Sequence, residues 1–104
     1  MAATIIGQGI TIEGEVTSED EVVVGGVVRG KLSIEGQLTI ESEGVVEADI
    51  GAQSVSIGGS VTGNVTASER VDLLAGGRLV GDVKAARLTI ADGASFKGNV
   101  DMDT

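Results

Sequence analysis

Apolar residues recur along this chain in a five-residue unit that has a small residue at its centre. The unit has the form apolar, any, small, any, apolar, and it occurs six times. Its copies cover residues 12–16, 28–32, 46–50, 61–65, 79–83 and 96–100. Their first residues are separated by 16, 18, 15, 18 and 17 positions. This recurrence indicates an internal structural repeat of about 17 residues.

A second apolar element lies between the copies and follows the same period. It consists of two apolar residues separated by one position, at Val22/Val24, Leu38/Ile40, Val55/Ile57, Val71/Leu73 and Leu88/Ile90. Apolar residues at every second position place one side of a strand inward and the other outward. The outward positions of the five-residue units carry many of the charges, such as Glu13, Arg29 and Asp82. The pattern predicts short, half-buried strands, and no stretch has the period of a helix.

The length of the repeat limits the repeat architectures that the chain can form. Helical repeats and propeller blades need roughly 33 residues or more, whereas 17 residues suit one coil of a parallel β-helix with about three short sides. Glycine pairs such as Gly25-Gly26, Gly58-Gly59 and Gly76-Gly77 fall between the apolar elements, where a coil must turn. We therefore predict an all-β fold, a single-stranded parallel β-helix (β-solenoid) of about six coils of 15–18 residues. Stacked ~4.8 Å apart, six coils give a body roughly 25–30 Å long. It forms one domain over residues 1–104, with short tails at 1–4 and 101–104.

The central residue of the five-residue unit is glycine in five copies and Ala48 in the third. Alanine disfavours positive φ angles, which glycine adopts readily. We therefore interpret this position as one that requires small size, near a tight corner of a narrow coil, rather than a special backbone angle.

Composition supports strands and excludes most chemistry. Val and Ile together number 24 against 6 Leu, and β-branched residues favour strands. The chain has no Cys and no His, which excludes thiolate and imidazole metal sites and the usual nucleophilic relays. A net charge of -9 with a single aromatic residue argues against binding to nucleic acid. No apolar run approaches the ~18 residues of a membrane span, and no leader peptide opens the chain, so we expect a cytoplasmic protein.

Clustered carboxylates are the remaining candidates for a chemical site. Glu19-Asp20-Glu21 and Glu41-Ser42-Glu43 lack the spacing of an EF-hand and fall in predicted turns, so we interpret them as solvated surface. We assign no catalytic, cofactor-binding or metal site. The charge is uneven, with ten acids and two bases in residues 1–50 against six acids and five bases in residues 51–104. Contacts between two C-terminal ends should therefore meet little repulsion.

The ends of a β-solenoid expose unpaired backbone groups, which natural proteins usually cap. This chain has no Pro and no predicted helix for that purpose. Its last coil presents Phe96, the one aromatic residue, with Val100, and Phe96 could simply plug the end of the core. Alternatively, both ends adhere and the chains join end to end, either symmetrically or head to tail. The first coil would contribute four isoleucines, Ile5, Ile6, Ile10 and Ile12.

These features resemble the bactofilins, a family of bacterial cytoskeletal proteins. The resemblance runs from about Ile5 to Val100 and rests on the repeated units, on SIGGSVTGNV at 56–65 and on ADGASFKG at 91–98. It implies a right-handed, three-sided β-helix that polymerises end to end into non-polar filaments without nucleotide or other cofactor. The implied partners are the chain itself and cell-wall or morphogenesis proteins, for which the filament is a scaffold. Some members bind the inner face of the membrane, but residues 1–4 are neither basic nor markedly apolar, which argues against attachment here.

Other β-solenoids fit less well. Left-handed hexapeptide-repeat enzymes need a six-residue period and a His, and calcium-binding β-rolls need Gly-Gly-x-Gly-x-Asp repeats, which this sequence lacks. Pectate-lyase-like enzymes have larger coils and longer chains. The main alternative is a non-polymerising adaptor that binds partner proteins through its flat faces.

Overall fold

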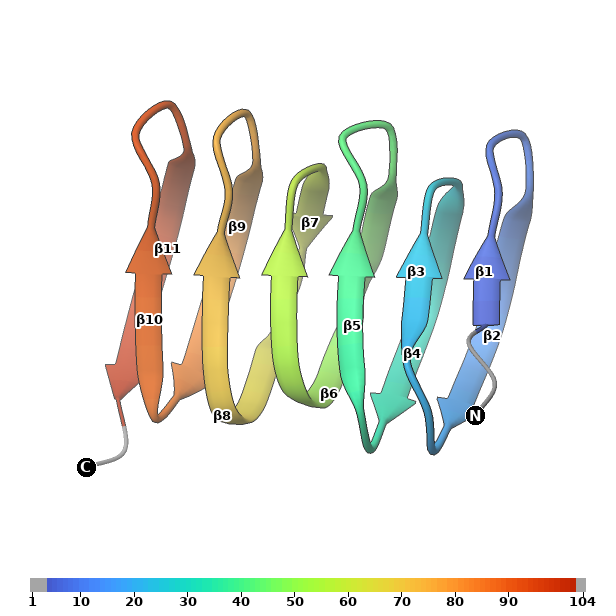
Figure 1. Ribbon diagram of the computed structural model, residues 1–104, viewed down its shortest axis with the longest axis horizontal. Coiled ribbons are helices and arrows are strands. Elements are labelled where there is room, and N and C mark those ends of the chain that lie inside the picture. The colour runs from blue at the N-terminus through green and yellow to red at the C-terminus, as the bar shows by residue number, and fades with distance from the viewer. Residues whose placement is uncertain (1–3, 103–104) are drawn as a thin grey trace.

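The computed structural model describes residues 4–102, with side chains for residues 4–101. These residues form eleven strands and no helix, so none of them belongs to a helix that could cross a membrane. All strand pairs are parallel, as predicted (Figure 1). The strands are β1 (Thr4–Ile6), β2 (Thr11–Ser18), β3 (Val22–Val24), β4 (Val27–Ile34), β5 (Gln37–Ile40), β6 (Val45–Ile57), β7 (Ser60–Thr62), β8 (Val65–Leu73), β9 (Arg78–Ala85), β10 (Arg87–Ile90) and β11 (Ser95–Met102).

Strand pairing divides every coil into three sides. The front face, toward the viewer in Figure 1, consists of residues 4–6, 22–24, 37–40, 54–57, 70–73 and 87–90. The second face consists of residues 11–13, 27–29, 45–47, 60–62, 78–80 and 95–97. The third face consists of residues 15–18, 31–34, 49–52, 65–67, 82–85 and 99–102.

These sides stack into a solenoid of six coils. The chain rises along the front face, crosses to the back and returns while it advances from the N-terminal to the C-terminal end, so the solenoid is right-handed (Figure 1). The principal extents are 31 × 25 × 22 Å. The longest runs along the stack (Figure 1) and lies close to the length predicted from the repeat.

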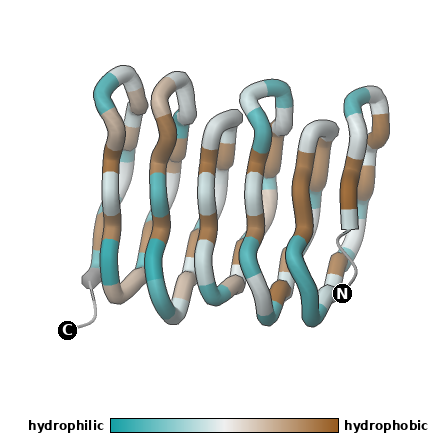
Figure 2. Tube along the Cα trace, viewed as in Figure 1, coloured by the Kyte–Doolittle hydropathy of each residue, from teal (hydrophilic) through white to brown (hydrophobic). Residues whose placement is uncertain are grey.

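The core is built from columns of equivalent aliphatic side chains. On each strand, alternate residues point inward and stack on the residue at the same place in the next coil. One such column contains Val22, Leu38, Val55 and Val71, another Val28, Val46, Val61 and Leu79, and a third Leu32, Ile50, Val65 and Val83. All of these side chains are buried, and no buried polar residue occurs among the described residues. Figure 2 shows the apolar segments recurring on the strands of successive coils.

The corner between the second and third faces differs from the prediction. The five central glycines, Gly14, Gly30, Gly63, Gly81 and Gly98, have φ between 124° and 139°. The interpretation that this position requires only small size is therefore wrong, because these coils turn the corner with a positive φ. Ala48 has an ordinary φ and a buried methyl group, so the third coil alone turns the corner in another way.

Size matters at this corner as well. A Cβ atom on Gly63 would overlap the carbonyl oxygen of Ala48 in the preceding coil, and one on Gly81 would overlap that of Gly63. Each corner glycine after the first thus lets one backbone pass directly over another. The corner requires both an unusual backbone angle and the absence of a side chain.

We predict that Gly63→Ala lowers the free energy of unfolding by roughly 2–4 kcal/mol, because it combines backbone strain with overlap against Ala48. The matched control is Gly76→Ala, where φ is 83° and an added Cβ would meet no atom within 4 Å. Strain alone should cost that variant about 1 kcal/mol. Denaturant unfolding followed by circular dichroism at one protein concentration compares them, and equal costs would contradict the stacked-corner account.

Candidate assembly interfaces at the two ends

The inward columns of the solenoid stop at the last coil, where β10 and β11 have no following coil. Among the residues with described side chains, the last large apolar members of these columns are Leu88, Ile90, Phe96 and Val100, which we call the C-terminal end surface. Ile90 is 48% exposed and Val100 is 40% exposed, whereas Leu73 and Val83, their equivalents one coil earlier, are each 1% exposed. The same position in the repeat is therefore core in one coil and open apolar surface in the last.

Phe96 is the member of the C-terminal end surface that follows Leu79 in its inward column. Its side chain packs against the core cluster and is only partly buried. A shallow hollow of about 380 Å³ runs beside it, lined by the neighbouring stretches 78–80 and 95–97. Phe96 thus covers the end of the core and also leaves part of its ring available for contact.

The four isoleucines predicted for the N-terminal end do not lie together. Ile6 is 3% exposed and belongs to the core, while Ile12 is partly buried against it. Ile5 is exposed on the outward side of β1, and Ile10 is exposed where the first turn meets β2. The apolar inward residues of the first coil are Ile6, Ile12 and Val16, which we call the N-terminal end surface. The registers place the polar Thr4 and Ser18 in inward columns as well.

Some end residues were missed by the sequence reasoning, although the repeat contains the signal for them. Val16 closes the first five-residue unit, and Leu88 and Ile90 form the last of the alternating apolar pairs. Positions that are inward in every middle coil must be inward in the terminal coils too. Extending the columns to both ends would have identified all three.

Backbone edges accompany these apolar surfaces. β1 pairs only with β3 and β2 only with β4, while β10 pairs only with β8 and β11 only with β9. Among the described residues, each end therefore has a row of ladder groups without a strand partner. Such edges are templates for pairing with another chain.

Charged residues lie on the lateral faces rather than in these end surfaces. Arg29 lies between two carboxylates of the second face, with Nε 3.0 Å from Glu47 and Nη1 3.7 Å from Glu13. Arg70 Nε lies 3.5 Å from Asp72 on the front face. All of these groups are exposed or only partly buried, so each pair contributes at most about 1 kcal/mol.

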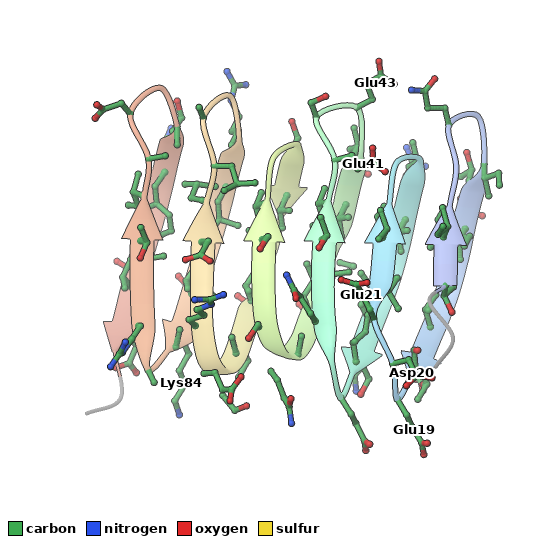
Figure 3. The ribbon with its side chains drawn as sticks, viewed as in Figure 1. Glu19, Asp20, Glu21, Glu41, Glu43 and Lys84 are labelled. Carbon is green, nitrogen blue, oxygen red and sulfur yellow. The ribbon has the colours of Figure 1, made fainter. Side chains whose placement is uncertain are left out.

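The two acidic clusters occupy turns, as predicted (Figure 3). Glu19 and Asp20 lie at the bend after β2, where the backbone N–H of Asp20 donates to Ser18 Oγ at 3.2 Å. Glu41 and Glu43 lie in the turn after β5, beside a shallow hollow of about 320 Å³. Within the described part of the chain, no group of three or more acidic side chains is placed to hold a metal ion.

Comparison with known sequences identifies relatives over almost the entire chain. The profile of one family, described as "Bactofilin: Polymer-forming cytoskeletal", matches residues 4–101. Bactofilin BacO of Myxococcus xanthus (strain DK1622) is 55% identical over 103 residues, which are 99% of this chain and 82% of BacO. Bactofilin BacP of the same organism is 42% identical over 99 residues, which are 95% of this chain and 41% of BacP.

Solved structures of two bactofilins are also similar to this chain. The cryo-EM reconstruction of Thermus thermophilus bactofilin double helical filaments matches with a TM-score of 0.91 and 34% identity, over 96% of this chain and 99% of the other. The solid-state NMR structure of the cytoskeletal bactofilin BacA matches with a TM-score of 0.88 and 33% identity, over 98% of this chain and 97% of the other. Sequence and fold together confirm the resemblance seen in the repeats, and the chain belongs to the bactofilin family of polymer-forming cytoskeletal proteins.

Proposed function

We propose that this protein assembles end to end into filaments without nucleotide, and that the filaments are a cytoplasmic scaffold for cell-shape or cell-envelope proteins. The observation that carries the proposal is the exposed apolar surface of the last coil. There Ile90 and Val100 are the exposed last members of columns that are buried in the middle coils. Membership in a polymer-forming family supports it, as does the filament reconstruction of the Thermus relative.

Two contributions stabilise an end-to-end contact. Fully burying an aliphatic or phenyl side chain contributes roughly 1.5–3 kcal/mol, and the half-exposed residues of the C-terminal end surface gain part of that. The unpaired backbone groups of β10 and β11 gain partners when another edge approaches them. Neither contribution requires a bound cofactor.

Charge favours a symmetric contact between two C-terminal ends. Residues 51–104 carry six acids against five bases, whereas residues 1–50 carry ten acids against two bases. Two N-terminal ends therefore repel each other more strongly, over a range of about 8–10 Å at physiological salt. Alternating C-to-C and N-to-N contacts produce a non-polar filament, in which the N-to-N contact is the weaker one.

End-to-end assembly leaves all three lateral faces exposed along the filament. A client protein could therefore bind any face without competing with polymerisation. We propose that cell-wall or morphogenesis proteins use these faces, which makes the protein structural rather than catalytic. A non-polymerising adaptor would use the same faces but would sediment as a single chain.

The variant Phe96→Arg tests the C-terminal contact. We expect it to abolish filaments and to leave a folded β-protein, because a guanidinium group at the centre of an apolar contact loses its hydration without gaining a partner. In a C-to-C contact both chains carry the change. Electron microscopy and sedimentation velocity measure assembly, and circular dichroism reports the fold.

The matched control for this variant is Ser95→Arg, which adds the same charge one residue earlier. Ser95 is exposed in the outward column of the second face that also contains Ser60 and Arg78, so this variant should still form filaments. Filaments of normal length from Phe96→Arg would refute the assignment of the contact. An unfolded Phe96→Arg chain would indicate that Phe96 mainly plugs the core.

Assembly should also be independent of nucleotides and divalent cations. The sequence has no Gly-x-x-x-x-Gly-Lys-Ser/Thr phosphate-binding loop, and apolar contact supplies the driving force directly. Sedimentation of the protein in a chelator without ATP or GTP should match sedimentation with Mg²⁺ and either nucleotide. A strict requirement for nucleotide would contradict the proposed mechanism.

A further inference from the structure

The second face carries two cations that have no carboxylate as a cross-strand neighbour. Arg78 lies in register between Ser60 and Ser95, and the neighbour of Lys97 is Val80. Both charged side chains are exposed, and neither takes part in an ion pair among the described residues. The C-terminal part of this face is therefore positive, on a chain whose net charge is -9.

Most of the other basic residues have an acidic partner within the chain. Four of these five have a carboxylate as an ion-pair partner or as a cross-strand neighbour: Arg29, Lys31, Arg70 and Lys84. The fifth, Arg87, lies on the front face and lines a hollow together with Glu69. Arg78 and Lys97 are thus a pair of cations on one face for which the chain supplies no such partner.

These two cations belong to a grid of outward side chains. Three neighbouring strands contribute two residues each: Ser60 and Thr62 from β7, Arg78 and Val80 from β9, and Ser95 and Lys97 from β11. Strands lie ~4.8 Å apart and alternate residues of one strand about 6.6 Å apart, so the Cα atoms of Arg78 and Lys97 are roughly 8 Å apart. Both cations line the hollow of about 380 Å³ that runs beside Phe96. The grid contains three hydroxyl groups and no carboxylate, a composition that suits an anionic ligand.

The column that contains Arg78 is apolar toward the N-terminal end. Val27 and Val45 precede Ser60 in register, and Val45 is 36% exposed. The column from Val27 to Ser95 crosses four intervals between coils, which amount to about 19 Å. An extended peptide of about six or seven residues covers this length, because a strand rises about 3.3 Å per residue. A ligand that lies along the column meets apolar side chains at one end and cations at the other.

We propose that the second face binds an extended segment of a client protein that is apolar at one end and acidic at the other. Residues on the same side of an extended segment recur about every 6.6 Å. Apolar residues at its first and third positions therefore cover Val27 and Val45, and carboxylates at its fifth and seventh positions reach Arg78 and Lys97. The inference rests on the proposed function, because it assigns one lateral face of the filament to a client.

The distribution of charge favours a narrow ligand over a membrane surface. Glu13 and Glu47 lie outward on the N-terminal part of the same face, where they share the single charge of Arg29. Glu41 and Glu43 lie in the turn that leads into β6 (Figure 3). A broad anionic surface would meet all of these carboxylates, whereas a single extended segment passes beside them.

A synthetic peptide of sequence Val-Thr-Val-Ser-Asp-Ser-Asp, coupled to a biosensor surface, tests this assignment. Filaments should bind it at about 0.1 M salt, because repeated sites along a filament make weak contacts additive. Arg78→Glu and Lys97→Glu should each raise the apparent Kd by about tenfold or more, because a carboxylate then meets a carboxylate. Val45→Asp should weaken binding as well. The double variant Arg78→Glu/Lys97→Glu should instead bind the peptide with Lys at both Asp positions more tightly than the wild type does.

The matched control is Arg87→Glu, which makes the same change of net charge at an exposed arginine on the front face. It should leave binding of the peptide unchanged, and an equal loss in this control would overturn the proposal. Loss of filaments by Arg78→Glu in electron microscopy would also overturn it, because the grid would then belong to the end-to-end contact. So would binding to phosphatidylglycerol vesicles that Arg78→Glu abolishes while the peptide still binds.

A neutral peptide separates this inference from the proposed function. Wild-type filaments should bind the Asp peptide at least about tenfold more tightly than the same peptide with Ser at both Asp positions, because two ion pairs are lost. Filaments that bind the two peptides equally overturn this inference alone. A complete absence of filaments overturns the proposed function as well.

Discussion

A coil of about 17 residues is too small to enclose its own apolar side chains, so each coil depends on the coils stacked above and below it. Leu38, Val55 and Val71 are fully buried because each lies between two equivalents in register. The same dependence makes the first and last coils incomplete. The exposed Ile90 and Val100 are core positions that lack a following coil. The end-to-end assembly that we propose would bury them through the same stacking that stabilises the middle coils.

Stacking also constrains the backbone at the corners. Where one strand bends directly over another, the residue at the bend has no room for a Cβ and adopts a φ that glycine alone tolerates well. The positive φ accounts for all five central glycines, and the lack of room for a Cβ applies to the four that follow Gly14. The corner at Ala48 shows that the stack accommodates one coil with a different bend, provided that its side chain is a methyl group directed inward.

The periodicity of apolar residues predicted most of the fold. A period of two along each strand, combined with a repeat of about 17 residues along the chain, is compatible with few architectures. It did not predict the corner angle, since a single alanine among six copies made small size the simpler explanation. Alternation also could not place the adjacent Ile5 and Ile6, two apolar residues on opposite sides of one strand. The pairing of Ile6 with Val24 resolves them, with Ile6 in the core and Ile5 on the front face. The end surfaces could have been predicted by extending the inward columns of the repeat to the first and last coils, which would have added Val16, Leu88 and Ile90.

Apolar and charged residues occupy different parts of the surface. Exposed apolar groups such as Ile90 and Val100 lie at the end of the solenoid, whereas charged groups line its faces, where Arg29 and Arg70 have partners within the chain. The central claim is that solenoids join along their own axis. Diffraction from oriented filaments tests this directly, because stacked coils repeat every ~4.8 Å. The account predicts a strong reflection at that spacing parallel to the filament axis, and the same reflection perpendicular to the axis would contradict it.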